Sequence, residues 1–353
     1  MVFFHILSKQ YGFFSSCLPM YNIIKFLSGR GHKNYLLSGI EVDENERKWL
    51  SQIKRGERSF FKKFLFLNRF LLSSSLKADF IFVYDPADAM ALSLFSRIIK
   101  KKMGAKLIYY NLELFVLDYE NLFKKLVGGL LEQILILNSD FFVALSPKRL
   151  ELAKSVFKIR CPTFIIPNSY DFEAEKLNYF PSEPPRVLLA GGLEESVLAG
   201  IESGLDGNFI FVFHGLSKYG IENLKKRFAQ LKNVEFYERF LSYDDFKSFV
   251  SKHDIGFVWY DKSKLNDRFA GWSASKYFRY LSIGKPVIVR DLPELKETTE
   301  ENNFGVAISS FSEIKNAVSK IVKNYSDYVK SIEQNYSKFE FTQNFKTFYE
   351  QIT

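Results

Sequence analysis

Short apolar segments alternate with helical patterns along the whole chain of 353 residues, and this alternation is the feature that most restricts its fold. In the first half, the segments that we expect to form strands are 2–7, 34–38, 79–84, 106–111, 140–145 and 163–167. They are apolar on both faces, which is typical of parallel strands covered by helices on each side of a sheet. The sequence therefore predicts an α/β protein.

The pattern breaks at 171–185, a polar segment that contains three prolines, and then restarts. In the second half, the expected strands begin at Arg186, Asn208, Val234, Asp254, Pro286 and Phe304. We therefore predict two Rossmann-like domains with parallel sheets, over 1–170 and 186–335, joined by a linker at 171–185 and followed by a helix over 336–353. Ligands of such sheets bind outside the carboxyl ends of the strands.

Composition and charge narrow the class of protein. A hydrophobic content of 47% with 25% charged residues is typical of globular chains. The two cysteines, Cys17 and Cys161, form neither a disulfide framework nor a metal-binding spacing, which suits a reducing cytosol. No apolar run approaches the ~18 residues of a membrane-spanning helix. The net charge of +9 favours anionic partners, but no nucleic-acid-binding motif occurs, so we expect no nucleic acid partner.

Residues 266–290 carry the strongest local signal. They indicate a loop, a short helix and a buried strand. We expect Ser273 or Ser275 to cap the helix, because a serine hydroxyl accepts hydrogen bonds from the first backbone N–H groups. Gly284 and Pro286 then end the helix.

Lys276 is the unusual residue of this segment. A cation in the first turn of a helix opposes the helix dipole, which favours negative charge there. A bound anion would resolve the conflict. The helix start, Gly271, the two serines and Lys276 together predict a phosphate site. The alternative is a capped helix whose lysine points into solvent.

The same segment resembles the donor-binding segment of GT-B glycosyltransferases, in the GT4-like bacterial group that builds surface polysaccharides. The residues that fit the pattern of this group are Ala274, Ser275, Lys276, Tyr280, Leu281, Gly284, Pro286, Val287 and Ile288. The better-known GT-B pattern has a glutamate three residues after the lysine, which holds the donor ribose. This chain has Arg279 there, which cannot accept a hydrogen bond from ribose but can meet a phosphate or carboxylate.

The resemblance implies a GT-B fold, in which two Rossmann-like domains face a cleft and the last helix packs back on the first domain. The donor would be a nucleotide-diphosphate sugar, with no cofactor. The residues that the resemblance and the loop positions assign to the donor are Gly12, Gly191, Gly192, His214, Phe240, Leu241, Tyr260, Asn266, Gly271, Ser273, Ala274, Ser275, Lys276 and Arg279.

Glu113 and Lys276 are the predicted catalytic residues. The segment 109–115 resembles a stretch of the same bacterial enzymes, and it places Glu113 at the end of a strand. A carboxylate there acts as a general base on an acceptor hydroxyl or holds the acceptor sugar. The alternative is a solvated loop carboxylate. No Asp-x-Asp triplet occurs, so we expect a reaction without a metal ion.

The segment 54–72 is both basic and rich in Phe and Leu. This pattern fits an interfacial helix on an anionic membrane surface. The alternative is a core helix with a basic outer face.

Together, these features predict a cytoplasmic glycosyltransferase at the inner face of the cytoplasmic membrane. It would move a sugar onto a lipid-linked saccharide in the synthesis of a capsule or O-antigen type polymer. Arg279 and the absence of a basic pair after Gly192 leave an alternative open, a GT-B-like subunit that binds a nucleotide sugar without catalysis. A nucleotide-sugar epimerase of the same architecture is a third possibility.

Overall fold

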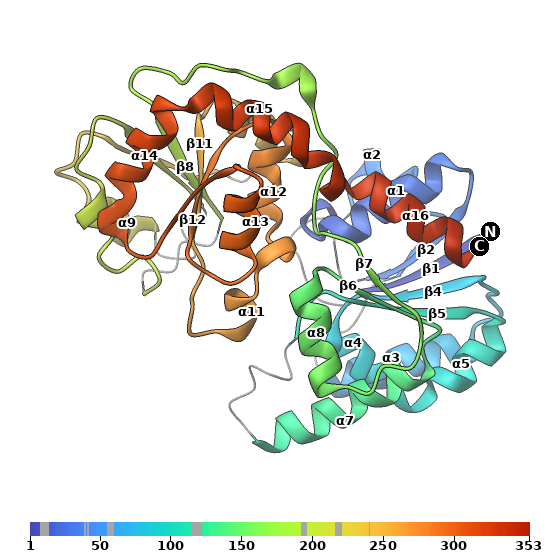
Figure 1. The fold of residues 1–353 in the computed structure, drawn as a ribbon. Helices are drawn as coiled ribbons and strands as arrows, with labels where there is room; N and C mark the ends of the chain where they lie inside the picture. The colour runs from blue at the N-terminus through green and yellow to red at the C-terminus, as the bar shows by residue number, and fades with distance from the viewer. Residues whose placement is uncertain are drawn as a thin grey trace. The chain divides into compact units, whose positions relative to one another are not determined.

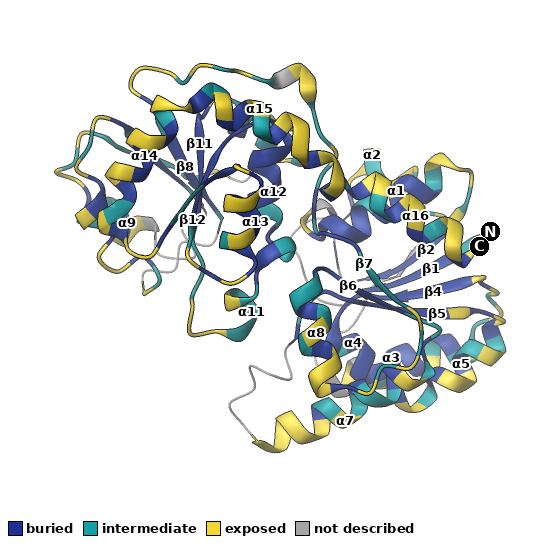
Figure 2. Ribbon diagram, viewed as in Figure 1, coloured by how far each residue is buried: buried dark blue, intermediate teal, exposed yellow. Residues whose placement is uncertain are grey.

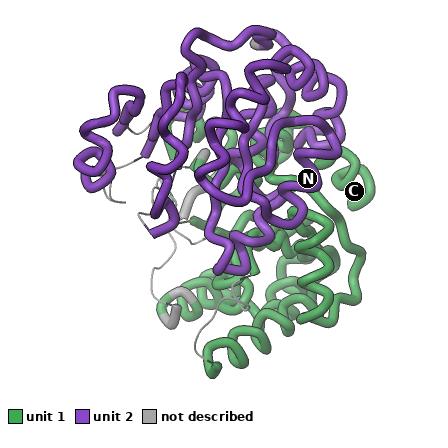
Figure 3. Tube along the Cα trace, turned by 60° about the vertical axis from the view of Figure 1, so that its left-hand side comes forward, with its two compact units in different colours: residues 1–168, 344–353 green, residues 169–343 purple. Residues whose placement is uncertain are grey.

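The structure is a computed structural model that describes residues 1–7, 14–38, 40, 42–54, 60–114, 122–191, 196–215, 221–239 and 241–353 (Figure 1). The chain divides into two compact units (Figure 3). Unit 1 consists of Met1–Asn168 and Asn344–Thr353, and unit 2 consists of Ser169–Gln343.

Unit 1 contains a parallel sheet with the strand order β3-β2-β1-β4-β5-β6-β7. The strands are β1 (Val2–Leu7), β2 (Lys33–Ser38), β3 (Gln52–Lys54), β4 (Phe80–Val83), β5 (Lys106–Asn111), β6 (Phe141–Ala144) and β7 (Thr163–Ile165). Six of them were predicted from their apolar runs. The short strand β3 was missed, because its three residues carry no alternating or continuous apolar pattern.

Helices cover both faces of this sheet (Figure 1). The helices of unit 1 are α1 (Leu18–Gly29), α2 (Glu44–Arg47), α3 (Phe60–Ser73), α4 (Pro86–Leu92), α5 (Ser96–Met103), α7 (Leu122–Asn138) and α8 (Pro147–Val156), with the 3-10 turns η1 (Phe14–Ser16) and η2 (Ser93–Phe95). α3, α4, α5 and α7 lie on one face, over a core that includes Ile6, Val83 and Tyr109.

The end of the chain packs on unit 1. Helix α16 (Phe341–Ile352) brings Phe345 to 5.0 Å from Phe26 of α1, and Phe348 to 4.8 Å from Phe164 of β7, both measured between ring centres. Phe345 and Phe348 are two of the aromatic residues whose spacing predicted a helix in this segment.

Unit 2 contains a parallel sheet with the strand order β10-β9-β8-β11-β12-β13. The strands are β8 (Arg186–Ala190), β9 (Ile210–His214), β10 (Val234–Tyr237), β11 (Ile255–Val258), β12 (Val287–Arg290) and β13 (Gly305–Ile308). The helices are α9 (Ile221–Arg227), α10 (Tyr243–Ser251), α11 (Leu265–Arg268), α12 (Ser275–Ser282), α13 (Leu295–Glu301), α14 (Ile314–Lys323) and α15 (Tyr325–Asn335), and the 3-10 turns are η3 (Ala174–Lys176), η4 (Ile201–Gly204), η6 (Gly271–Ser273), η7 (Phe311–Glu313) and η8 (Tyr336–Phe339). All six strands were predicted, and the two parallel α/β sheets confirm the predicted fold class.

Residues 171–185, predicted as a linker, lie within unit 2. The backbone N–H of Glu173 donates to the carbonyl oxygen of Ser282 at 2.8 Å. Leu177 and Tyr179 pack against the core of unit 2. Because Leu177 and Tyr179 pack against that core, the segment is part of unit 2.

Helix α3 lies in the segment 54–72, for which the sequence left two interpretations open. Leu67 and Leu71 are fully buried, whereas Lys62, Leu65 and Arg69 are exposed. Over 60–72 this is the arrangement of a core helix with a basic outer face, and residues 55–59 lie outside the described part. Within the described part of the chain, no helix has the length and apolar character needed to cross a membrane.

Candidate functional site

Tyr280 fixes helix α12 against the sheet of unit 2. Its hydroxyl donates to the carbonyl oxygen of Leu188 at 2.9 Å and accepts from the backbone N–H of Ala190 at 3.2 Å. Its ring lies on Gly256 of β11, where a Cβ atom would stand only 2.2 Å from the ring. A glycine at this position is therefore what lets α12 approach the sheet so closely.

Lys276 lies one helical turn before Tyr280, on the same side of α12. Its ammonium group therefore reaches the carboxyl end of β8. A Cβ atom on Gly191 would lie 2.7 Å from the Lys276 Nζ. Gly191 has a φ of 109°, a conformation that favours glycine, and its N–H donates to the carbonyl oxygen of His214 at 2.9 Å. The Nζ atom also lies 5.4 Å from the ring centre of Tyr260, which follows β11.

The ammonium group of Lys276 forms neither a hydrogen bond nor an ion pair with any residue that the structure describes. Burial lowers the pKa of Lys276, and the carboxylate of Asp267 partly opposes this shift. Removing a cation from water without giving it a partner costs free energy. An anion bound between Lys276 and Gly191 would recover that cost.

The start of α12 differs from the prediction that Ser273 or Ser275 caps it. The residue in the cap position is Ala274, which has no side-chain acceptor, and Ser275 is the first residue of the helix. The Ser273 hydroxyl donates instead to the carbonyl oxygen of Ala270 at 2.5 Å. The capping prediction is therefore wrong, because η6 ends immediately before the helix and turns Ser273 backwards. The cap residue of α12 makes no side-chain hydrogen bond to the first N–H groups of the helix.

Glu294 holds the loop before α12, and the sequence reasoning missed it. It follows β12, is 4% exposed and has a φ of 61°, which is rare for a residue with a side chain. Its Oε2 accepts from the backbone N–H of Trp272 at 3.4 Å, and a Cβ atom on Gly271 would clash with it at 1.8 Å. The only sequence signal was a carboxylate in the loop that follows a predicted strand.

The structure groups Arg279 with a different set of residues. Its guanidinium carbon lies 3.5 Å from the ring centre of Tyr170 and 4.6 Å from that of Tyr243. The side chain is 1% exposed, and its Nη1 lies 3.9 Å from an oxygen of Glu173. Arg279 therefore packs α12 onto the segment that opens unit 2, through cation–π contacts and one long ion pair.

The remaining predicted donor residues lie at several places in the chain. His214 donates from Nε2 to the carbonyl oxygen of Arg239 at 3.1 Å, and burial lowers its pKa. Leu241 precedes α10, and Asn266 lies on α11. Gly12, Gly192 and Phe240 lie outside the described residues.

Glu113 lies in unit 1, just after β5, and is partly exposed. The neighbouring Asn111 is buried, and its amide donates to the Glu113 carbonyl oxygen at 3.1 Å. Asn111 also donates to the Tyr109 hydroxyl at 2.9 Å, and Tyr109 donates to Glu132 at 2.5 Å. Burial raises the pKa of Glu132 to about 7. Glu113 thus stands beside a buried polar network in the same unit.

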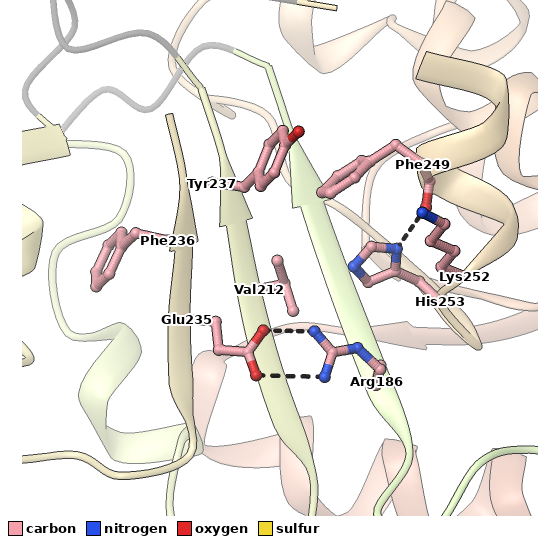
Figure 4. A pocket seen from close by; sticks show the side chains of 8 residues that line it. All are labelled: Arg186, Val212, Glu235, Phe236, Tyr237, Phe249, Lys252 and His253. Carbon is pink, nitrogen blue, oxygen red and sulfur yellow. Dashed lines mark hydrogen bonds and ion pairs between the residues drawn. The ribbon is translucent and has the colours of Figure 1, made fainter. Parts of the chain in front are cut away.

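A cavity of about 330 Å³ lies elsewhere in unit 2, between β9, β10 and α10 (Figure 4). Arg186 and Glu235 form an ion pair at one end, and Tyr237 and Phe249 lie at the other. The residues that line the cavity include none of the predicted donor residues. Over the described residues, no three His, Cys, Asp or Glu side chains are arranged to hold a metal ion.

Comparisons with known proteins relate this geometry to families. Residues 211–350 match the family described as Glucosyltransferase 3-like, C-terminal domain, a range that contains Lys276, Arg279 and Glu294. No curated protein matches this chain in sequence.

Solved structures are similar over nearly the whole chain. Sucrose-phosphate synthase from Thermosynechococcus elongatus has a TM-score of 0.69 at 12% identity, covering 99% of this chain and 98% of that chain. HepE from Anabaena in complex with UDP has a TM-score of 0.68 at 12% identity, covering 99% of each chain. UDP-GlcNAc 2-epimerase from Neisseria meningitidis, bound to UDP-GlcNAc, has a TM-score of 0.61 at 14% identity, covering 100% of this chain and 99% of that chain.

Such low identities show the fold and no more, and the fold agrees with the two parallel sheets described above. The chain therefore has the GT-B glycosyltransferase fold, and its second unit is similar in sequence to the C-terminal domain of glucosyltransferase 3-like proteins.

Proposed function

We propose that this chain is a glycosyltransferase that moves a sugar from a nucleotide-diphosphate sugar to a lipid-linked saccharide, without a metal ion. The observation that carries the donor part is the ammonium group of the half-buried Lys276, which lies against the backbone of Gly191 and forms no hydrogen bond or ion pair with any described residue. The glucosyltransferase 3-like match over 211–350 supports the reaction class. Two similar structures, HepE in complex with UDP and the epimerase bound to UDP-GlcNAc, support the nucleotide-sugar donor.

The chemistry follows from charge. When the sugar leaves its donor, negative charge develops on the diphosphate. Lys276 and the N–H groups at the start of α12, which no side chain of the cap residue occupies, supply positive charge at this place, so they stabilise the leaving group. Glu294 holds the loop of Gly271 and Trp272 in place for this contact.

Glu113 takes the acceptor side of the reaction in this proposal. As a carboxylate after a strand of unit 1, it positions the acceptor sugar or removes the proton of its attacking hydroxyl. The exposed cations of α3, Lys62 and Arg69, support an anionic membrane surface as the place of the lipid-linked acceptor. The product would be a polymer of the capsule or O-antigen type, made at the inner face of the membrane.

Titration calorimetry with UDP and ADP tests the donor site. We expect Lys276→Ala to weaken binding of the preferred nucleotide by about 1.5–3 kcal/mol, the worth of a hydrogen bond to a charged group. That loss corresponds to a rise in Kd of roughly tenfold to a hundredfold. Because burial lowers the pKa of Lys276, wild-type affinity should fall as the pH rises through that lowered pKa, when the ammonium loses its charge.

Lys320→Ala is the matched control. Lys320 is an exposed lysine on α14 of the same unit, so its removal changes the net charge equally without touching the site. Unchanged nucleotide affinity in a folded Lys276→Ala protein would contradict the proposed donor site.

The UDP-GlcNAc 2-epimerase fold supports a second candidate, an epimerase reaction on the same donor. Proton NMR of UDP-GlcNAc incubated with the protein, with and without a saccharide acceptor, separates the candidates. A transferase gives a new glycosidic product only with acceptor, an epimerase converts the sugar without one, and a binding subunit does neither.

A further inference from the structure

Helix α7 exposes apolar side chains where a surface helix normally exposes polar ones. The exposed fractions are 68% for Leu122, 73% for Phe123, 64% for Leu126 and 63% for Leu130. Leu122, Leu126 and Leu130 recur every four residues, so they share one face of the helix. The opposite face buries Leu135 and Ile136 in the core. α7 is thus apolar towards solvent as well as towards the protein, unlike an ordinary amphipathic helix.

Other helices on the same side of the sheet also expose apolar side chains. The side-chain amide of Asn138 on α7 donates to the Ser96 hydroxyl on α5 at 3.0 Å, and α5 also packs against α3. Figures 1 and 2 show α3, α5 and α7 on the same side of the sheet of unit 1, with exposed positions on their outer sides. We name as the apolar face the exposed side chains of these elements and of η2: Leu65, Leu94, Ile98, Leu122, Phe123, Leu126 and Leu130.

The exposed charges on the helices of the apolar face have one sign. Over 60–73, 93–103 and 122–138 the sequence contains a single carboxylate, Glu132, and that side chain is 1% exposed. The exposed cations on the same helices are Lys62, Arg69, Arg97, Lys101, Lys124 and Lys125. On these helices the surface therefore presents leucines and a phenylalanine among lysines and arginines, and the three ranges themselves contain no exposed carboxylate.

We infer that the apolar face docks on a bilayer that contains anionic phospholipid. The leucines and Phe123 enter the boundary between headgroups and acyl chains, and the surrounding cations meet the lipid phosphates. A second copy of this chain fits less well, because pairing two such faces would set cations opposite cations. The inference deepens the lipid-linked part of the proposed function and places the main apolar contact on α7, whereas the sequence pointed to 54–72.

Vesicle sedimentation without donor or acceptor tests this inference. The probes are vesicles of phosphatidylcholine alone, and of phosphatidylcholine with phosphatidylglycerol. The wild-type protein should sediment with the anionic vesicles at low salt, and at least tenfold less at 1 M salt, where the Debye length falls to about 3 Å. The triple substitution Leu122→Gln, Leu126→Gln and Leu130→Gln should lower partitioning at least tenfold. These side chains are exposed, so the fold should persist.

Two double variants, each lacking two positive charges, show whether binding depends on the cations of α7 or on the net charge of the protein. Lys124→Gln with Lys125→Gln should reduce binding severalfold and flatten its salt dependence. Lys320→Gln with Lys323→Gln, on exposed positions of α14 in unit 2, removes the same charge and should leave binding unchanged. Nucleotide calorimetry on the leucine variant should match the wild type, so a failure of docking is distinguishable from a failure of the donor site.

Three results would overturn the inference. One is a wild-type protein that ignores anionic vesicles. Another is a leucine variant that binds them as well as the wild type does. The third is a wild-type protein that does not bind vesicles and is a dimer by light scattering, and that becomes a monomer with the leucine substitutions. The apolar face would then be an interface between copies of this chain.

Discussion

The two units differ in how the protein itself satisfies one ionisable side chain in each, Glu132 in unit 1 and Lys276 in unit 2. In unit 1, Glu132 is buried, yet it accepts hydrogen bonds from Tyr109 at 2.5 Å and from Asn111 at 3.4 Å. In unit 2, Lys276 is half-buried beside Gly191 and has no such partner among the described residues. The first group is satisfied by its own unit, whereas the second lacks a counter-charge.

This difference suggests how to tell a structural group from a binding group. Burial shifts the pKa of both residues, that of Glu132 upwards to about 7 and that of Lys276 downwards. The pKa shift alone therefore does not separate them. What separates them is whether the neighbouring side chains already complete the hydrogen bonding.

Glu113→Gln tests whether unit 1 contributes to the reaction through its exposed carboxylate. We expect turnover to fall about a hundredfold, a typical loss for a proton-transfer group, with donor affinity unchanged. Steady-state kinetics and nucleotide calorimetry measure the two quantities. Glu151→Gln, at an exposed position on α8, is the control. A parallel loss of donor affinity would place Glu113 on the donor side and contradict the proposed division.

Gly191→Ala tests whether Lys276 needs the open backbone beside it. The new methyl group would overlap the lysine Nζ, so we expect the Kd for nucleotide diphosphate to rise about tenfold, the effect of a loss near 1.4 kcal/mol. Gly200→Ala is a matched control, because Gly200 also has a positive φ of 84° but open space around its Cβ position. The control should lose a similar amount of stability and keep its affinity. Equal losses of affinity would attribute the effect to strain.

Glu132→Gln tests whether the buried carboxyl group of Glu132 makes the stability of the protein depend on pH. Because the folded pKa of Glu132 is raised to about 7, the native state holds a proton that the unfolded state releases above pH 4.5. Wild-type stability should therefore decline as the pH rises from about 4.5 to about 7. The amide cannot ionise, so the variant should lack this part of the decline, which we expect to be about 5–10 °C in Tm.

Thermal unfolding of both proteins between pH 4.5 and 8 measures this difference, and nucleotide affinity should be unchanged. A variant whose pH profile matches the wild type would show that Glu132 stays ionised in the folded protein.

The sequence predicted most of the fold, because the strands of parallel sheets are continuous apolar runs that need no knowledge of their partners. It also pointed to Lys276 as a candidate, because a cation at a helix start conflicts with the helix dipole wherever the helix lies. The serine cap was predicted wrongly, since composition near a helix start does not fix which residue takes the cap position. Ala274 holds that position, and the 3-10 turn η6 determines where Ser273 points.

Only the tertiary structure decided which residues meet. Lys276 reaches Gly191 because Tyr280 fixes α12 on β8, and Arg279 packs between Tyr170 and Tyr243. Helix α7 is apolar on several sides, so its periodicity does not say which side faces solvent. Packing against the sheet settles that choice and leaves Leu122, Leu126 and Leu130 outside. The physical reason is common to these cases: local pattern specifies what a segment can bury, while long-range contacts specify what it does bury.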